Sequence, residues 1–283
     1  MKFGRNYRLT VQIDDETSVV IQPPMTVQFN IVRSTNASIN TGSFQIYNLS
    51  ESRRQDIFQD RFDTSNQKKV TFEAGYGKLT TVFKGYIFQA DSSRVGSDII
   101  TTIQARDGFN DIRNDQISAT YPAGLTVKQV VENLTGGFSA ITKGTISEFD
   151  DTFPRPVAVD GNVFELINKY TGDKAYVDLN ELNAVKNEDV INAAVVSFDS
   201  KTGLLETPKR EGAFLSIKTL FQPDVQMSQL VDVNSSILKQ YKGQYKVIGV
   251  QHQGVISEAV GGQCSSSFNL LLGGQLYGAY NQL

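Results

Sequence analysis

Three acidic side chains form a cluster of potentially reactive groups in this sequence. Glu148, Asp150 and Asp151 lie within the stretch SEFDDTF. A pair of carboxylates could supply the acid and the base of a glycosidase, and carboxylate oxygens could bind a calcium ion. Acidic clusters are more often solvated loop residues. We favour that interpretation, with a calcium site ahead of catalysis as the alternative.

Nucleophilic catalysis would depend on His252, because it is the single histidine of the chain. Any Ser or Cys nucleophile would need it as a base. His252 lies in the alternating stretch VIGVQHQGV, which predicts a strand and a histidine that packs against neighbours or lies at an interface. Cys264, the single cysteine, is expected to be a small buried hydrophobe. We therefore expect no enzyme, and no catalytic, cofactor-binding or metal-binding residue.

The stretch AGYGKLTT, residues 74–81, contains the glycine and lysine of a phosphate-binding loop. Such a loop also needs Ser or Thr directly after the lysine, and then a helix. Leu79 follows Lys78 and the next residues alternate like a strand, so we predict a hairpin turn instead. The net charge of −3 gives no global basic field for nucleic acid. The absence of a disulfide suits a reducing compartment.

Most of the elements that must position these residues are strands. Apolar residues alternate in YRLTVQI (7–13) and again in MTVQFNIVR (25–33), and residues 69–108 contain three or four more such runs. Turns are expected at 75–78, 91–93 and 96–98. This spacing indicates an antiparallel sandwich or barrel. We assign residues 1–115 to this first β unit.

One short helix interrupts the first β unit. In GSFQIYNLSESRRQDIF (42–58), an apolar strand gives way to a charged run that ends in Ile57 and Phe58. The Ser50 hydroxyl is expected to accept an N–H of the first helical turn. The sequence therefore predicts a helix near 50–61.

The middle of the chain, residues 116–188, changes to a small α/β pattern. GLTVKQVVENLTGG predicts a helix capped by Thr126 and ended by Gly136, and NVFELINKYTG predicts a second helix ended by Gly172. FPRPVAVDG, between them, is expected to be an extended connector. KAYVDLNELNAV is expected to be a hairpin that turns near Asn180.

The last part of the chain, residues 189–283, returns to β structure. Its strand candidates are AAVVSF, AFLSIKTL, QLVDV, YKVIGVQHQG and SSSFNLLL. The longest apolar run there, FNLLLGG, is far shorter than the ~20 residues of a membrane span.

Four stretches in this order resemble one protein family. They are NASINTGSFQIYNLSESRRQDIF, VTFEAGYGKLTTVFKGYIFQADSSRVGSDIITTIQARDG, the middle run from GLTVKQVVENL to NVFELINKYTGDKAYVDLNEL, and the late run TGLLETPKREGAFLSIKTLFQPDVQMSQLVDVNSS with YKGQYKVIGVQHQGV. Together they are similar to the central baseplate hub proteins of tailed bacteriophages, including the hub of Mu-type contractile tails. The similarity extends from about residue 20 to residue 272.

The resemblance implies a mainly β fold with two tail-tube-like antiparallel β-barrels that flank the small helical domain. Three such chains form a homotrimeric ring, which adapts the sixfold tail tube to the threefold central spike. The implied partners are the tail tube or tube-initiator protein, the spike, baseplate wedge proteins and the tape measure protein, with DNA only in transit. The protein would be a structural part of the virion tail baseplate, assembled in the host bacterial cytoplasm and not inserted in a membrane. The helix near 50–61 would cover a barrel end with Ile57, Phe58 and Phe62.

Two alternatives stay open at this point. One is a distal-tail or receptor-binding adaptor of a non-contractile tail, which shares the barrel fold. The other is a tail-associated cell-wall hydrolase, for which residues 120–185 are the only available segment. That segment contains Glu132, Glu148 and Glu165 as candidate acids.

Overall fold

The computed structural model describes residues 4–36, 39–63, 67–235, 237–258 and 262–272. Strands dominate, which confirms the prediction of a mainly β chain. Period-two alternation explains why. In β1 (Arg5–Gln12), for example, Tyr7, Leu9 and Val11 are buried, and the residues between them are not.

The first β region contains seven strands and one helix. After β1 come β2 (Ser18–Ile21), β3 (Val27–Ser34), β4 (Thr41–Tyr47), α1 (Glu51–Ile57), β5 (Lys69–Tyr76), β6 (Thr80–Val95) and β7 (Asp98–Arg106). The turns expected at 75–78 and 96–98 are present, at residues 77–78 and 96–97. The turn expected at 91–93 is wrong, because β6 continues to Val95 and pairs with β7 up to Asp98. The polar residues there lie on the exposed part of a two-stranded hairpin.

Two predictions about α1 are wrong. The Ser50 side chain does not cap the helix, and its hydroxyl lies 3.3 Å from the Ser52 hydroxyl. Ile57 is fully buried, but Phe58 and Phe62 are 55% and 81% exposed. The helix ends at Ile57, and the chain then extends so that the buried Gln59 pairs with Ala90 of β6. This backbone bridge turns both phenylalanines outward.

The insertion contains short helices and strands. They are α2 (Phe109–Asn114), β8 (Gln116–Tyr121), α3 (Val127–Leu134), η1 (Thr135–Gly137), β9 (Thr142–Ile146), β10 (Val157–Asn162), α4 (Val163–Thr171), β11 (Ala175–Asp178) and β12 (Glu181–Ala184). Thr126 caps α3 through a capping box with Gln129, as expected for a cap. Gly172 ends α4 with a φ of 64°, also as expected.

Other expectations for the insertion need correction. Gly136 does not end α3 in a left-handed conformation, because the chain continues into the 3₁₀ turn η1. The stretch expected to be a connector contains β10, which pairs with β8 along six residues. The β11–β12 hairpin does turn at Leu179 and Asn180, which have φ values of 55° and 66°.

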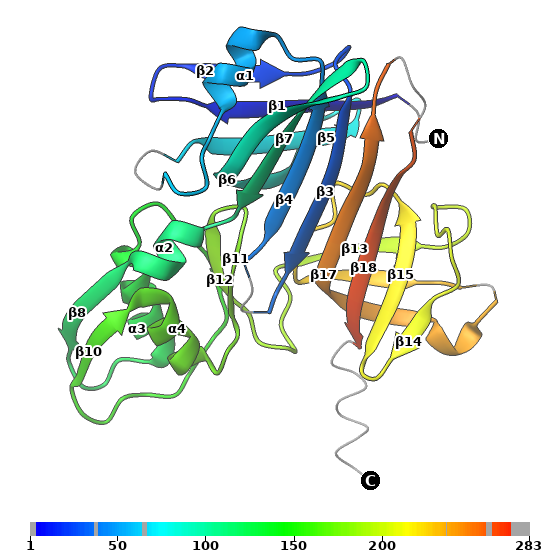
Figure 1. Cartoon of the computed structure of the whole chain (residues 1–283). Coiled ribbons are helices and arrows are strands. Elements are labelled where there is room, and N and C mark those ends of the chain that lie inside the picture. The colour runs from blue at the N-terminus through cyan, green and yellow to red at the C-terminus, as the bar shows by residue number, and fades with distance from the viewer. Residues whose placement is uncertain (1–3, 37–38, 64–66, 236, 259–261, 273–283) are drawn as a thin grey trace.

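The last β region contains β13 (Asn192–Phe198), β14 (Lys209–Glu211), β15 (Phe214–Leu220), β16 (Gln229–Val233), the 3₁₀ turn η2 (Lys239–Tyr241), β17 (Gly243–Ile256) and β18 (Cys264–Leu272). Figure 1 shows its strands beside those of the first β region, with the insertion set to one side. The five strand candidates of this region all correspond to strands.

One sheet joins the two β regions. Its main path runs β14-β15-β18-β17-β3-β4-β7-β6-β5-β1-β2, with β13 and β16 attached through β17. β17 makes the connection because its first half pairs with β16 and its second half with β3. Among the described residues, the pairing does not return from β2 to β14, so the expected two barrels appear as two curled halves of one sheet.

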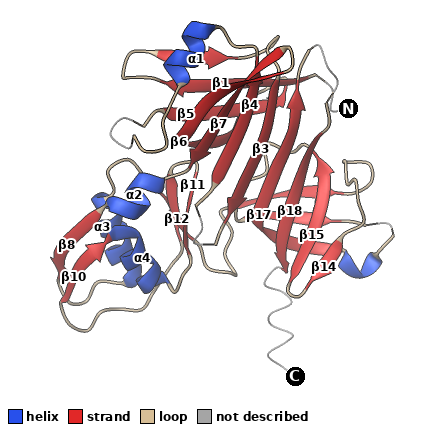
Figure 2. Cartoon of the chain, in the orientation of Figure 1, coloured by secondary structure: helices blue, strands red, loops and turns tan. Residues whose placement is uncertain are grey.

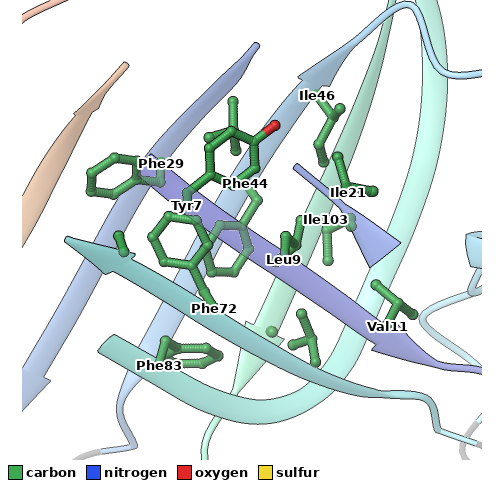
Figure 3. Packing of buried hydrophobic residues seen from close by; sticks show 14 of the residues in the cluster. Tyr7, Leu9, Val11, Ile21, Phe29, Phe44, Ile46, Phe72, Phe83 and Ile103 are labelled. Atoms are coloured by element: carbon green, nitrogen blue, oxygen red, sulfur yellow. The ribbon is translucent and has the colours of Figure 1, made fainter. Parts of the chain in front are cut away.

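The buried hydrophobic residues form three clusters, which we call the first, second and third core. The first lies mainly in the first β region, with Phe221, Ile256 and Cys264 added from the last. In it, Phe29, Phe44, Phe72 and Phe83 pack in tilted pairs with centroids 5.1–5.9 Å apart (Figure 3). The second lies in the insertion and the third mainly in the last β region. The domain boundaries given above remain predictions.

Candidate functional site: a neutral sheet face and a buried joint

A broad face of the large sheet is polar and carries little charge. We call it the neutral face. It includes these outward residues of β15, β18, β17, β3, β4, β7 and β6: Ser216, Lys218, Ser267, Asn269, Gln251, Gln253, Gln28, Asn30, Val32, Thr41, Ser43, Gln45, Thr102, Gln104, Arg106, Gln89, Lys84, Tyr86 and Asp91. Figure 2 shows most of these strands side by side. All of these side chains are half-buried or exposed, whereas the opposite side of the same strands contributes to the first and third cores.

The cations of the neutral face are Lys218 near one end and Arg106 and Lys84 near the other, and Lys218 and Arg106 each have a partner. The Lys218 ammonium is 2.7 Å from a carboxylate oxygen of Glu206. The Arg106 guanidinium lies 3.8 Å from the ring centroid of Phe88 and 4.8 Å from that of Phe109. Between these two positions the face presents amides and hydroxyls.

Hydrogen bonds across strands fix some of these amides. Gln251 Nε2 donates to Asn30 Oδ1 over 2.8 Å, and Ser216 Oγ donates to Asn269 Oδ1 over 3.0 Å. Such a surface is well hydrated, and it offers phosphate groups no row of cations.

A second feature, a buried joint, connects the first β region to the insertion. Arg33 of β3 donates to both carboxylate oxygens of Asp178 in β11, over 2.8 Å and 2.6 Å. Arg33 is only 3% exposed. Asn40 Nδ2 adds a hydrogen bond of 3.2 Å to the same carboxylate, so its charge is compensated and hydrogen-bonded.

Asp107, at the end of β7, belongs to the same joint. Its Oδ1 accepts the N–H of Asn180 over 3.0 Å, which holds the turn of the β11–β12 hairpin. The pKa of Asp107 is raised to about 7, first by burial and then by the neighbouring Asp178 carboxylate, against the opposing effects of the Asn180 N–H and of Arg33. The joint thus places two carboxylates around one guanidinium.

β11 contacts all three cores through successive residues. Ala175 and Val177 lie in the second core, Tyr176 lies in the third, and Asp178 reaches Arg33 beside the first. The Tyr176 hydroxyl donates to Ser228 Oγ over 2.9 Å. β11 therefore fixes the insertion against both β regions at once.

A lysine in β17 adds a further contact to this attachment. The Lys246 ammonium donates to the carbonyl of Lys186 over 2.6 Å, in the segment that leaves the insertion. Burial lowers the pKa of Lys246 to about 8, which Asp189 and Glu188 partly oppose.

The acidic cluster singled out from sequence does not form a site in the described structure. Glu148 pairs with Lys128 of α3 and is otherwise largely exposed. Glu132 pairs with Lys143 over 3.4 Å, and Glu165 lies in the first turn of α4. In the described part of the chain, no group of three or more His, Cys, Asp or Glu side chains is arranged to hold a metal ion.

His252 and Cys264 are both packed inside the sheet. His252 is fully buried, its Nδ1 lies 2.7 Å from Ser266 Oγ, and its ring meets those of Phe221 and Phe268 edge-on. Burial lowers the pKa of His252 to about 3, and the charge of Arg33 contributes. Cys264 is 5% exposed, and its Sγ lies 3.2 Å from the carbonyl of Val255. The expectation of a packed histidine and a buried cysteine is confirmed.

The motif IYNLS owes its geometry to Asn48, a role that the sequence pattern did not predict. Asn48 has a φ of 57°. Its Oδ1 accepts the N–H of Ile99 and its Nδ2 donates to Asp98, each over 2.9 Å. The residue therefore ties the corner after β4 to the β6–β7 hairpin, and this corner is a structural one.

The comparisons with known proteins come from sequence and from structure. Residues 7–255 match the baseplate hub gp41 family. The chain belongs to this family. No curated protein sequence matches the chain. Among the described residues, no helix of this baseplate hub family member is long and apolar enough to cross a membrane.

Solved structures share the fold of this family member at low sequence identity. The 43 kDa tail protein of prophage MuSo2 from Shewanella oneidensis aligns with a TM-score of 0.63 and 10% identity, over 95% of this chain and 97% of the other. A tail protein from Neisseria meningitidis MC58 aligns with a TM-score of 0.61 and 10% identity, over 94% of this chain and 96% of the other. An Escherichia coli type VI secretion component is described as similar to the T4 tail proteins gp27 and gp5. It aligns with a TM-score of 0.56 and 10% identity, over 87% of this chain and 73% of the other. The match to the baseplate hub family, together with this shared fold, supports a structural role in a phage tail.

Proposed function

We propose that this protein is the hub of a phage tail baseplate, and that three copies form a ring whose channel is lined by the neutral face. The observation that carries the proposal is the continuity of this face across both β regions, through the pairing of β17 with β3. A chain with two curled sheet halves contributes two similar positions to a ring. Three chains then supply six positions, which suits a sixfold tube above a threefold spike.

The chemistry of the neutral face supports passage of a polyanion. Exposed lysine and arginine rows bind phosphates through release of counterions, which would retain DNA in the channel. Gln28, Asn30 and Gln253 offer neutral amides instead. The tape measure protein and then DNA would pass over this surface, and neither would be bound stably.

The buried joint supports a role of this protein in transmitting force. β11 and Arg33 lock the insertion against both β regions through buried contacts. We assign the outward contacts of the hub, with wedge proteins and spike, to surfaces away from the neutral face. The distal-tail adaptor remains the second candidate, because it would share the barrel fold. The wall hydrolase has no support from the positions of Glu132, Glu148 and Glu165.

Light scattering of the purified protein across a concentration range tests the ring. We expect a species of three times the chain mass of 31.2 kDa, and particle averages that show a ring with a central channel. A monomer at every concentration would contradict the ring and favour an adaptor.

Positive charge added to the neutral face tests whether this face lines the channel. In a tail that can be reconstituted with this hub, the pair Gln28→Lys and Gln253→Lys should slow DNA release, with recovery at higher salt. The matched control places two lysines at the exposed neutral positions Ser52 and Gln55 of α1, outside the neutral face. Equal release rates for both variants would show that the neutral face does not line the channel.

A further inference from the structure

Four cations gather where β5, β6 and β7 meet α2, and we call them the cation cluster. They are Lys69 of β5, Lys84 of β6, Arg106 of β7 and Arg113 of α2. The ion pairs between described residues all involve other side chains. Within the described part of the chain, the cation cluster therefore has no carboxylate that neutralises it.

The strand register places three of these cations on one side of the sheet. Lys69 lies opposite Tyr86, and Tyr86 lies opposite Arg106. The Lys69 ammonium is 6.0 Å from the ring centroid of Tyr86. Lys84 precedes Tyr86 by one pleat and so projects on the same side. Because Arg106 also lies opposite Thr41, this side is the one that carries the neutral face.

Aromatic rings contact the two arginines where carboxylates would form ordinary ion pairs. The Arg106 guanidinium lies between two rings, 3.8 Å from the centroid of Phe88 and 4.8 Å from that of Phe109. The Arg113 guanidinium lies 6.0 Å from the centroid of the same Phe109 ring. A ring attracts a guanidinium to its face and leaves the N–H groups at the guanidinium edge free. These N–H groups can bind an anion.

Contacts of α2 hold the cluster in place without a ligand. The Asp111 carboxylate accepts the N–H groups of Ala140 and Ile141 over 2.7 Å and 2.6 Å. Asn110 Nδ2 donates to Gln67 Oε1, just before β5, over 2.6 Å. α2 is thereby tied both to the insertion and to the chain that enters β5. A surface that is already ordered loses less entropy when a partner binds.

The exposure of the cluster and its rings indicate the chemistry of the partner. Lys69, Lys84 and Arg113 are exposed, and Arg106 is half-buried. Their N–H groups fit the oxygen atoms of carboxylates or of phosphates. A single-stranded nucleic acid would also need free ring faces on which its bases could stack. Each ring of this cluster already holds a cation, which favours a partner that offers carboxylates.

From these observations we propose that the cation cluster binds an acidic segment of another protein, with Asp or Glu carboxylates on the N–H groups of Arg106 and its neighbouring cations. This inference goes beyond the proposed function. One consequence rests on the proposed function: in the channel, a bound acidic segment would neutralise cations that otherwise retain passing DNA.

Fluorescence anisotropy with the full chain tests the proposal. The probes are a labelled hexaglutamate peptide and a labelled hexathymidylate oligonucleotide of similar charge. The wild type should bind the peptide saturably and more tightly than the oligonucleotide. Lys84→Glu with Arg113→Glu should weaken peptide binding by about tenfold or more, because two charge-assisted contacts become repulsive.

Two further variants make the result specific. Arg106→Lys should weaken peptide binding although the charge is unchanged, because lysine lacks the planar fork that stacks between the rings. This variant also carries the test if circular dichroism shows that the charge-reversal pair does not fold. The matched control, Lys239→Glu with Lys242→Glu, makes the same change in net charge at exposed positions of the last β region. It should bind the peptide like the wild type.

Four results would overturn the proposal. They are the absence of saturable peptide binding, equal weakening by the control, tighter binding of the oligonucleotide than of the peptide, and a change of particle mass in the charge-reversal variant. The last would mean that a second copy of the chain covers the cluster. A trimer without peptide binding would overturn this inference alone, whereas a monomer that binds the peptide would contradict only the proposed ring.

Discussion

Arg33 and Asp178 form a bidentate ion pair across the boundary between the first β region and the insertion, although 145 residues separate them in sequence. The pair is almost fully buried. Desolvation of two charges costs free energy, and the paired geometry together with Asn40 offsets that cost. The pair therefore matters more for the orientation of the insertion than for net stability.

The first prediction concerns this pair. Asp178→Asn should lower the free energy of unfolding by about 3–5 kcal/mol, because it leaves the Arg33 charge buried without its partner. Urea titration followed by circular dichroism measures the loss. Replacing both residues, as Arg33→Met with Asp178→Leu, should restore a large part of it. The exposed pair of Lys128 and Glu148 is the control, and Lys128→Met should leave the midpoint unchanged.

A double variant as unstable as Asp178→Asn alone would contradict this account. It would mean that the hydrogen bonds of Asn40 and Val82 to the pair carry the stability, and not charge compensation.

The second prediction concerns Asp107 and pH. The folded-state pKa of about 7 lies above the ordinary value of 3.8, so the folded protein binds this proton more tightly than the unfolded chain does. The stabilisation of the folded protein by protonated Asp107 is fully present below about pH 4 and is lost as the pH rises through 7. Burial is the largest cause of the raised pKa, and Asp178 adds to it, whereas the N–H of Asn180 and the charge of Arg33 oppose it.

Asp107→Asn keeps the acceptor for Asn180 and removes the titration. The difference in unfolding free energy between variant and wild type should grow by about 1.4 kcal/mol per pH unit between pH 4.5 and 6.5, and level off above 7. Urea titrations at four pH values measure it. If the unfolding free energies of variant and wild type changed in parallel with pH, Asp107 would be ionised in the folded protein throughout this range.

Much of the fold follows from sequence because apolar alternation is a local signal. It located β1, β3 and β17, and the residues Thr126 and Gly172 at helix ends. The joint was not found, although one signal was present. In MTVQFNIVR, period two places Arg33 on the same side as Phe29 and Ile31, and a buried arginine requires an acidic partner.

The partner could not be named from sequence. Asp178 lies in DLN, whose composition indicates a turn, and only the tertiary fold brings this turn to β3. The single sheet was missed for a similar reason. Alternation shows that β17 is a strand but not which strands pair with its two halves. The neutral face likewise depends on the order of strands, which periodicity does not determine.

The third prediction concerns His252. Burial lowers its pKa to about 3, so the ring should stay neutral in the folded protein down to at least pH 4.5. The unfolded chain binds a proton below about 6.5, and His252 therefore costs stability as the pH falls from 6.5 towards 3. The chemical shift of its ring C–H, which is unique in this chain, reports the protonation state. A titration midpoint near pH 6 in the folded protein would contradict the buried geometry.

The fourth prediction separates the two roles of Asn48. Asn48→Gly keeps the left-handed conformation and removes the side-chain hydrogen bonds to Asp98 and Ile99, whereas Asn48→Ala also strains the backbone. Asn48→Ala should therefore lower the free energy of unfolding by about 1 kcal/mol more than Asn48→Gly. Both variants should raise amide exchange in the hairpin of residues 91–98. Equal losses in the two variants would show that the side chain alone matters.

The last prediction compares neighbouring hydrophobic residues around the end of α1. Ile57→Ala should lower the free energy of unfolding by about 2–5 kcal/mol, because the side chain is fully buried in the first core. Phe62→Ser should change it by no more than about 0.5 kcal/mol, since the ring is 81% exposed and contacts mainly the guanidinium of Arg61. Urea unfolding of the two variants measures both changes in the free energy of unfolding. A large loss for Phe62→Ser would mean that the ring packs against the protein in solution, as the sequence had suggested. A small loss would leave Phe62 as an exposed aromatic residue beside a helix whose own role is to bury Ile57.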